Sequence, residues 1–217
     1  MWALRKSLIN KSLELVHTEG WDSCMQSASL SLNLSPAIVS QLFPKGQYEL
    51  IEYLMQMWNE QLYIDFHPYN EITPTNLYTI TRKRLEYMNP YLPIWTQAMK
   101  IGANPQNIIT TTNTLWNTFD SIWKLAGEKN VDTFYPIKRG SLAMIYLTTE
   151  VKIVKNPHKV EECWKEMEEK MMKSFDAGKV AENVFETMKF VANANYRILQ
   201  SFYPEPSSHQ NPINKYQ

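Results

Sequence analysis

The spacing of apolar residues predicts helices along nearly the whole chain. Apolar positions recur at intervals of three and four residues, and no stretch shows the sustained alternation of a half-buried strand. Gly and Pro residues divide this pattern into about ten segments. We predict helices over residues 2–17, 22–30, 36–42, 47–65, 74–88, 92–101, 105–125, 135–154, 157–175 and 178–202. The predicted fold class is therefore all-α, with no sheet.

Charge and composition exclude several classes of protein. The 217 residues carry 22 Lys and Arg against 22 Asp and Glu, which argues against a strongly basic nucleic-acid binder and a highly charged disordered chain. Cys24 and Cys163 are the only cysteines, so neither a disulfide framework nor a cysteine-rich zinc site is expected. No run approaches the roughly 18 consecutive apolar residues that span a bilayer.

No catalytic or metal-binding signature supports an enzyme. The four histidines (His17, His67, His158 and His209) lie in separate segments, and no two have the spacing of a zinc helix. Glycine-rich phosphate loops and a GxSxG nucleophile turn are absent from the sequence. The acidic run around Glu161-Glu162 alternates with lysines at helical spacing, as on a solvated helix face. We therefore predict no catalytic residue, no metal ligand and no cofactor.

The first three predicted helices resemble the helix-turn-helix unit of TetR-type regulators. Leu42-Phe43-Pro44-Lys45-Gly46 followed by Glu49-Leu50-Ile51 is similar to the turn that follows the recognition helix in that family. DNA binding needs cations against phosphates and polar side chains against bases. Residues 22–43 contain no Lys or Arg, and the candidate recognition helix offers only Ser40 and Gln41. We predict a degenerate helix-turn-helix domain over residues 1–46 that binds no nucleic acid, and a DNA-binding regulator is the least favoured alternative.

A second ordered set of motifs extends over about residues 8–200. These motifs are Gly20-Trp21, Leu32-x-Leu34-Ser35, Phe43 to Leu50, Ile122-Trp123, Ala126-Gly127-Glu128, Asp132, Lys138-Arg139, Leu142, Ile145-Tyr146, Thr148-Thr149-Glu150 and Trp164. In order and spacing they resemble a second family with a TetR-like fold, the mitochondrial lipid-binding accessory proteins of ubiquinone (coenzyme Q) biosynthesis.

The resemblance implies a non-catalytic protein that holds an isoprenoid lipid or a phospholipid inside a helical domain, here residues 47–202, and presents quinone intermediates to a hydroxylase. It also implies a homodimer or a heterodimer with a paralogue. The expected location is peripheral, on the matrix side of the mitochondrial inner membrane. Residues 203–217 are polar and are predicted to form a tail.

Candidate lipid-binding residues lie on the inner sides of the predicted helices. Flexible methionines among aromatic rings suit an adaptable apolar cavity, although the same stripe is also typical of a plain core. These residues are Trp95, Met99, Leu115, Phe119, Ile122, Trp123, Leu142, Ile145, Tyr146, Met171 and Phe175.

A candidate partner surface follows the Ala-Gly motif. Here the chain departs from the family, with Glu128 in place of Asp and Tyr135-Pro136 in place of Trp-Tyr. The resemblance places contacts with the hydroxylase on these residues: Gly127, Glu128, Asp132, Tyr135, Pro136 and Arg139.

Each end of the chain leaves more than one interpretation open. The last predicted helix has an apolar face that suits a membrane interface, a partner or the protein's own core; it contains Val184, Met188, Val191, Ile198 and Phe202. Residues 1–13 carry three cations and no acid, as in an uncleaved mitochondrial targeting helix or an ordinary first helix.

Two functional classes remain. One is a lipid-binding presenter of quinone intermediates. The other is a family member recruited as a structural accessory subunit of a respiratory-chain assembly in the mitochondrial inner membrane, which the departures at Glu128 and Tyr135-Pro136 favour.

Overall fold

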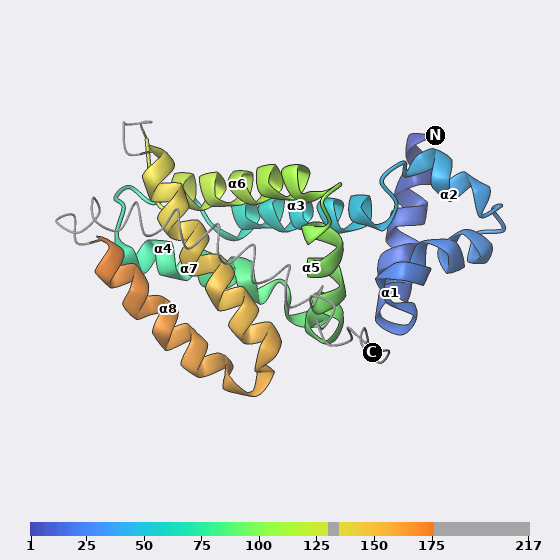
Figure 1. Cartoon of the computed structure of the whole chain (residues 1–217). Coiled ribbons are helices and arrows are strands. Elements are labelled where there is room, and N and C mark those ends of the chain that lie inside the picture. Colours follow the sequence, from blue (N-terminus) through green and yellow to red (C-terminus); the bar gives the residue numbers. More distant parts are fainter. Residues whose placement is uncertain (130–134, 176–217) are drawn as a thin grey trace, which may run out of the picture.

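The computed structural model describes residues 1–129 and 135–175, and over these residues the chain is helical without strands (Figure 1). The all-α class is confirmed. The elements are α1 (Trp2–Ser31), α2 (Ala37–Leu42), α3 (Gln47–Asp65), α4 (Pro74–Glu86), the 3-10 helix η1 (Asn89–Ile94), α5 (Trp95–Ala103), α6 (Ile108–Leu125), α7 (Tyr135–Lys155), the 3-10 helix η2 (Pro157–Lys159) and α8 (Val160–Phe175). The predicted helix over residues 178–202 and the tail over residues 203–217 lie outside the described residues.

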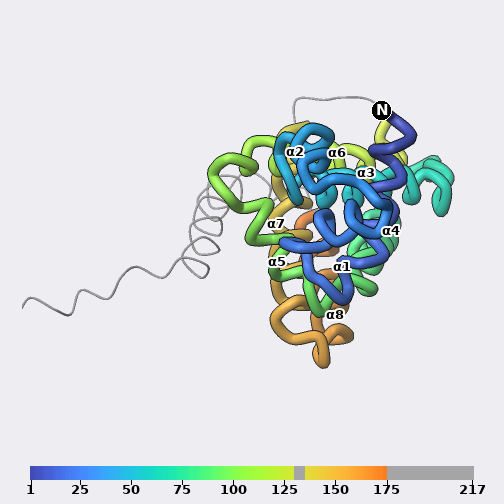
Figure 2. The backbone as a smooth tube through the Cα atoms, turned by 90° about the vertical axis from the view of Figure 1, so that its right-hand side faces the viewer, coloured from blue at the N-terminus to red at the C-terminus, as the bar shows by residue number. Residues whose placement is uncertain are grey.

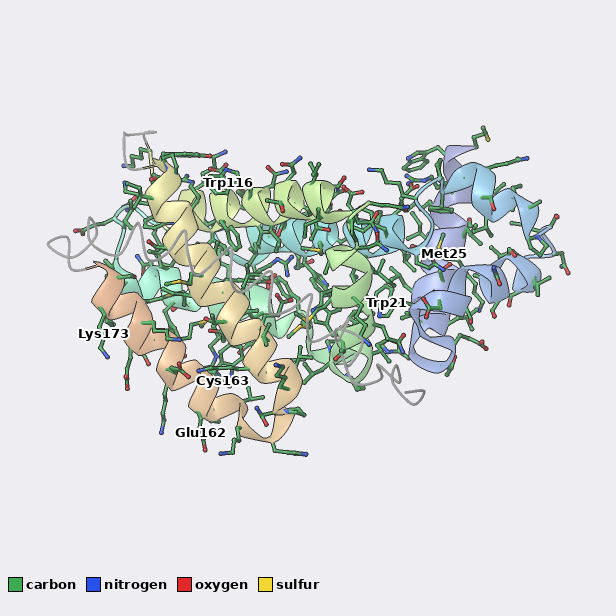
Figure 3. The ribbon with its side chains drawn as sticks, in the orientation of Figure 1. Trp21, Met25, Trp116, Glu162, Cys163 and Lys173 are labelled. Carbon is green, nitrogen blue, oxygen red and sulfur yellow. The ribbon has the colours of Figure 1, made fainter. Side chains whose placement is uncertain are left out.

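The first two predicted helices form one element, α1, that bends at Gly20. Gly20 has φ 73° and ψ 172°, a conformation outside the helical region that side-chain-bearing residues rarely adopt. After the bend, the backbone N–H of Trp21 donates to Gln97 Oε1 at 3.3 Å, and its indole N–H donates to the carbonyl of Ile94 at 3.2 Å. Trp21 thus lies buried between α1 and α5 (Figure 3). The bend docks the second half of α1 on the rest of the protein.

Two helices begin later than predicted, because proline and asparagine shape the preceding turns. Residues 89–94 form η1 instead of the start of α5, since Pro93 has no N–H to donate within a helix. Before α6, Asn104 Oδ1 accepts from the N–H of Gln106 at 3.0 Å, and the Asn107 side chain donates to the carbonyl of Ile101 at 2.9 Å. These local hydrogen bonds compete with the first helical turn.

The described helices form an N-terminal lobe and a larger body joined by α3. Figure 1 shows α1 and α2 at one end of the molecule and α4, α7 and α8 at the other, while α3 lies beside α6. In the view of Figure 2, α1 and α2 lie in front of the body. Within the body, α7 packs against α6 and α8, and α8 also packs against α4. The assignment of residues 1–46 to a degenerate helix-turn-helix domain stays a prediction.

Candidate functional site

A small cavity lies among α4, α6, α7 and α8. Its volume is about 60 Å³. Of the predicted lipid-binding residues, Trp123, Leu142, Ile145 and Met171 line it. The full lining is Leu77, Trp123, Ile137, Lys138, Ser141, Leu142, Ile145, Met171 and Ser174. The wall is therefore mainly apolar, with a cation, two hydroxyls and an indole among its polar groups.

The other predicted lipid-binding residues pack in the core instead of lining this cavity. Phe119 and Tyr146 are buried and contact each other edge to face, with ring centroids 5.5 Å apart. Ile122 is fully buried, and Leu115 and Met99 are partly buried against the core. Trp95 packs in an aromatic cluster, with its ring centroid 6.1 Å from that of Trp21 and 5.2 Å from that of Trp58. The side chain of Phe175 lies outside the described residues.

The size of the cavity limits what it holds in this form. A single water needs roughly 10–15 Å³, and pockets for drug-sized ligands begin at roughly 300 Å³. The observed volume of about 60 Å³ lies between these limits. The cavity therefore accommodates one end of a lipid and not a whole prenylated ring.

A buried charge cluster joins α6 to α7 next to the cavity. The Arg139 side chain is only 1% exposed, and its Nη2 donates to Asp120 Oδ1 at 2.9 Å and to Glu128 Oε2. Lys138 Nζ lies 3.4 Å from Glu128 Oε1. The Tyr135 hydroxyl donates to Asp120 Oδ1 at 2.8 Å, and the Tyr135 ring lies under the Arg139 guanidinium, 3.5 Å from centroid to Cζ.

These contacts favour the ionised forms of Asp120 and Arg139. Burial raises the pKa of Asp120, but hydrogen bonds from Lys124, Arg139 and Tyr135 outweigh it, so the pKa lies below its usual value. Burial likewise lowers the pKa of Arg139, but its bonds to Glu128 and Asp120 outweigh that effect and raise the pKa. Asp120 and Arg139 therefore form an ion pair at neutral pH.

Gly127 positions Glu128 within this cluster. Its φ is +110°, and a Cβ at this position would lie 2.7 Å from the carbonyl oxygen of Tyr69. The same segment is attached by the N–H of Tyr69, which donates to the carbonyl of Leu125 at 2.9 Å. The close approach of two backbone segments thus requires glycine immediately before Glu128.

The predicted partner surface is only partly exposed. The Glu128 and Arg139 side chains are 5% and 1% exposed, and they form an ion pair with each other in the interior. Tyr135 is half-buried and Pro136 is exposed, while Asp132 lies outside the described residues. Sequence reasoning missed Asp120, whose only visible signal was its four-residue spacing from Lys124.

A second buried polar network, around Arg84, was also missed. Arg84 is 1% exposed and donates to Asn59 Oδ1 at 2.9 Å and to the Tyr146 hydroxyl at 3.4 Å. Nearby, the Trp95 indole N–H donates to Glu150 Oε1 at 2.8 Å, and burial raises the pKa of Glu150. The sequence Lys83-Arg84 reads as a solvated helix face, so no sequence signal marked this arginine as buried.

The short helix α2 carries no positively charged side chain. On α2 the exposed residues are Ala37, Ser40 and Gln41. Arg5, on α1, is engaged by Glu49, with 2.6 Å between Nη2 and Oε2. The expectation that the chain binds no nucleic acid stays a prediction.

Neither a membrane span nor a metal cluster is found in the part of the chain that the structure describes. No helix there has the length and hydropathy that a bilayer crossing needs. No group of three or more His, Cys, Asp or Glu side chains converges there on one point. The residues predicted for the membrane or partner helix, Val184 to Phe202, lie outside this part.

Comparison with known proteins confirms the family resemblance. The family model described as COQ9 matches residues 108–178, which begin at the first residue of α6 and include α7 and α8. The chain is 26% identical over 195 residues to "Ubiquinone biosynthesis protein COQ9, mitochondrial" of Bos taurus, a match that covers 85% of this chain and 61% of the relative. The protein of the same name from Homo sapiens is 26% identical over 196 residues, with the same two coverages. The chain thus spans about 61% of the length of the curated relatives it matches.

Proposed function

We propose that this chain is a non-catalytic lipid-binding protein that binds isoprenoid quinone intermediates and presents them in ubiquinone biosynthesis. The observation that carries the proposal is which helices the family model matches. Residues 108–178 comprise α6, α7 and α8, which together with α4 surround the cavity. The printed names of the relatives are mitochondrial, which supports the same compartment for this chain, and we extend this to a peripheral position on the matrix side of the inner membrane.

The cavity wall supports apolar binding and allows some enlargement. Leu142, Ile145 and Met171 provide apolar surface. Methionine has three rotatable bonds and fills irregular gaps, so Met171 is the lining residue best able to change rotamer and admit more of a ligand. A prenyl chain has the flexibility and the apolar surface that such a narrow space requires.

The test is lipid extraction and mass spectrometry on the full chain, purified from its native source. Wild type is expected to carry a quinone-like lipid. Ser141→Phe, which fills the cavity, is expected to lose it, whereas Thr112→Phe, at an exposed position of α6, is expected to retain it. Folded wild-type protein without any lipid would contradict the proposal.

A structural accessory subunit of a respiratory-chain assembly is the second candidate. It is favoured by two features of the predicted hydroxylase surface. The Glu128 carboxylate is paired with Arg139 in the interior, and an exposed proline follows Tyr135. The small volume of the cavity points the same way. Native electrophoresis of tagged protein from mitochondria separates the two candidates. Migration with a large complex and without lipid supports the subunit, whereas a dimer that carries lipid and binds a hydroxylase supports the presenter.

A further inference from the structure

Unpaired hydrogen-bond donors gather beside the cavity. The indole Nε1 of Trp123 and the Nε and Nη1 of Arg139 are buried atoms without an acceptor in the described structure. Trp123 is 7% exposed and Arg139 is 1% exposed. An unsatisfied buried donor costs about 1–3 kcal/mol, and more when it is charged, so three such atoms in one region call for an acceptor.

The donors belong to one place in the fold. The guanidinium carbon of Arg139 lies 6.0 Å from the centroid of the Trp123 ring, and Lys138 Nζ lies 5.8 Å from the same centroid. Trp123 and Lys138 are both part of the cavity wall, together with Ser141. The cavity wall therefore carries donors from Trp123, Lys138 and Ser141 together with the apolar side chains of Leu142 and Met171.

The carboxylates nearby do not satisfy these donors. Asp120 and Glu128 both accept from Nη2 of Arg139, and the remaining two nitrogens of that guanidinium stay unpaired. Within the described cluster, the two carboxylates lie among three cations, Lys124, Lys138 and Arg139. An incoming group with acceptor oxygens, neutral or anionic, would therefore be favoured, and a cationic group would not.

We propose that the Trp123 indole N–H donates to the oxygen-bearing head group of an amphiphilic ligand in the cavity, with the Arg139 guanidinium behind the wall, 6.0 Å from the Trp123 ring, and with the adjoining apolar atoms between Leu142 and Met171. The acceptor is a quinone, phenol or phosphate oxygen. This inference rests on the proposed lipid-binding function and adds the orientation: the head group is inserted first. A cavity of about 60 Å³ has room for that end of the molecule, and the rest of the ligand extends beyond it.

The test uses Trp123→Phe, which keeps an aromatic ring but removes the N–H, with Trp116→Phe as its control. Trp116 is half-buried on the same helix and does not line the cavity (Figure 3). Isothermal calorimetry on the full chain compares a short-chain ubiquinone with an alkylbenzene of equal chain length. Loss of one hydrogen bond is expected to weaken quinone binding by Trp123→Phe about three- to tenfold, and to leave alkylbenzene binding and the Trp116→Phe control unchanged.

Two further measurements make the outcome decisive. The ¹⁵N-indole resonance that is missing from Trp123→Phe is expected to move downfield in wild type when the quinone is added. Vesicles with and without phosphatidic acid test a phosphate group as the source of oxygen. If Trp123→Phe weakens binding only to the vesicles that contain phosphatidic acid, the head group is a phosphate. If wild type and Trp123→Phe bind quinone equally, and also bind vesicles with phosphatidic acid equally, the proposed head-group site is overturned. The proposal of lipid binding would still stand. If wild type binds none of these probes, lipid binding itself fails.

Discussion

Replacement of Arg139 by methionine measures how far the buried charge cluster stabilises the junction of α6 and α7. Methionine keeps most of the apolar length but removes the cation. The Glu128 carboxylate, 5% exposed, then retains Lys138, whose Nζ is 3.4 Å from Oε1. Removal of one partner from a buried pair costs about 3–5 kcal/mol, and the remaining lysine places the expected loss near the lower end, about 3 kcal/mol.

A loss of this size is easily measured. Domains have unfolding free energies of about 5–15 kcal/mol, so about 3 kcal/mol is a large fraction. At roughly 2–4 °C per kcal/mol for a chain of this length, Tm is expected to fall by roughly 6–12 °C. Urea unfolding followed by circular dichroism gives the free energy, and a thermal scan gives Tm.

The control variants separate a buried pair from an exposed one. Arg82→Met breaks an ion pair with Glu86 whose side chains are 36% and 33% exposed, so its cost is expected to stay below about 1 kcal/mol. The double variant Arg139→Met/Glu128→Leu removes both charges and is expected to recover most of the loss. If Arg139→Met costs no more than Arg82→Met, the cluster does not stabilise the junction.

Three further perturbations test other local conclusions by thermal and urea unfolding. Gly127→Ala, with φ +110° and a Cβ 2.7 Å from the Tyr69 carbonyl, is expected to cost at least about 2 kcal/mol. The control Gly140→Ala, inside α7 with open space around it, is expected to stabilise by about 0.5–1 kcal/mol; equal stabilities of the two variants would disprove the steric argument. The native pKa of Asp120 lies below its unfolded value, so its contribution is present above about pH 4 and is lost as the pH falls through the native pKa. Asp120→Asn should therefore flatten the decline of Tm below about pH 4, and an unchanged acid profile would argue against this. Thr73→Ala removes the N-cap of α4 and is expected to cost about 1 kcal/mol, with Thr73→Ser retaining it; a neutral alanine variant would show that the cap contributes little.

Helix positions were largely predictable, because their signals are local. The bounds predicted for α3, residues 47–65, are those observed, since the Pro44-Lys45-Gly46 turn and His67-Pro68 flank the apolar repeat. The start of α6 was displaced by three residues. Side-chain hydrogen bonds of Asn104 and Asn107 decide that start, and the apolar repeat does not report them.

Candidate residues were predictable as a buried set but not as a site. Trp123, Leu142 and Met171 carry the same sequence signal as Trp95, yet the first three line the cavity and Trp95 packs in an aromatic cluster. The periodicity identifies an inner face without saying which neighbour it meets. The apolar periodicity does not predict that Arg84 is buried, since a charged residue in a basic pair is expected at the surface.

The amino-acid sequence by itself determined the all-α class, the order of the helices, the turns between them and the likeness to ubiquinone-biosynthesis proteins. These depend on periodicity, caps and motifs, which act over a few residues. Only the tertiary structure decided that Glu128 and Arg139 are buried as a pair, that Trp123 and Arg139 retain unpaired donors, and that the cavity is small. These properties depend on how α4, α6, α7 and α8 pack across long sequence separations, where a shift of a few ångströms decides whether a side chain fills space or borders it.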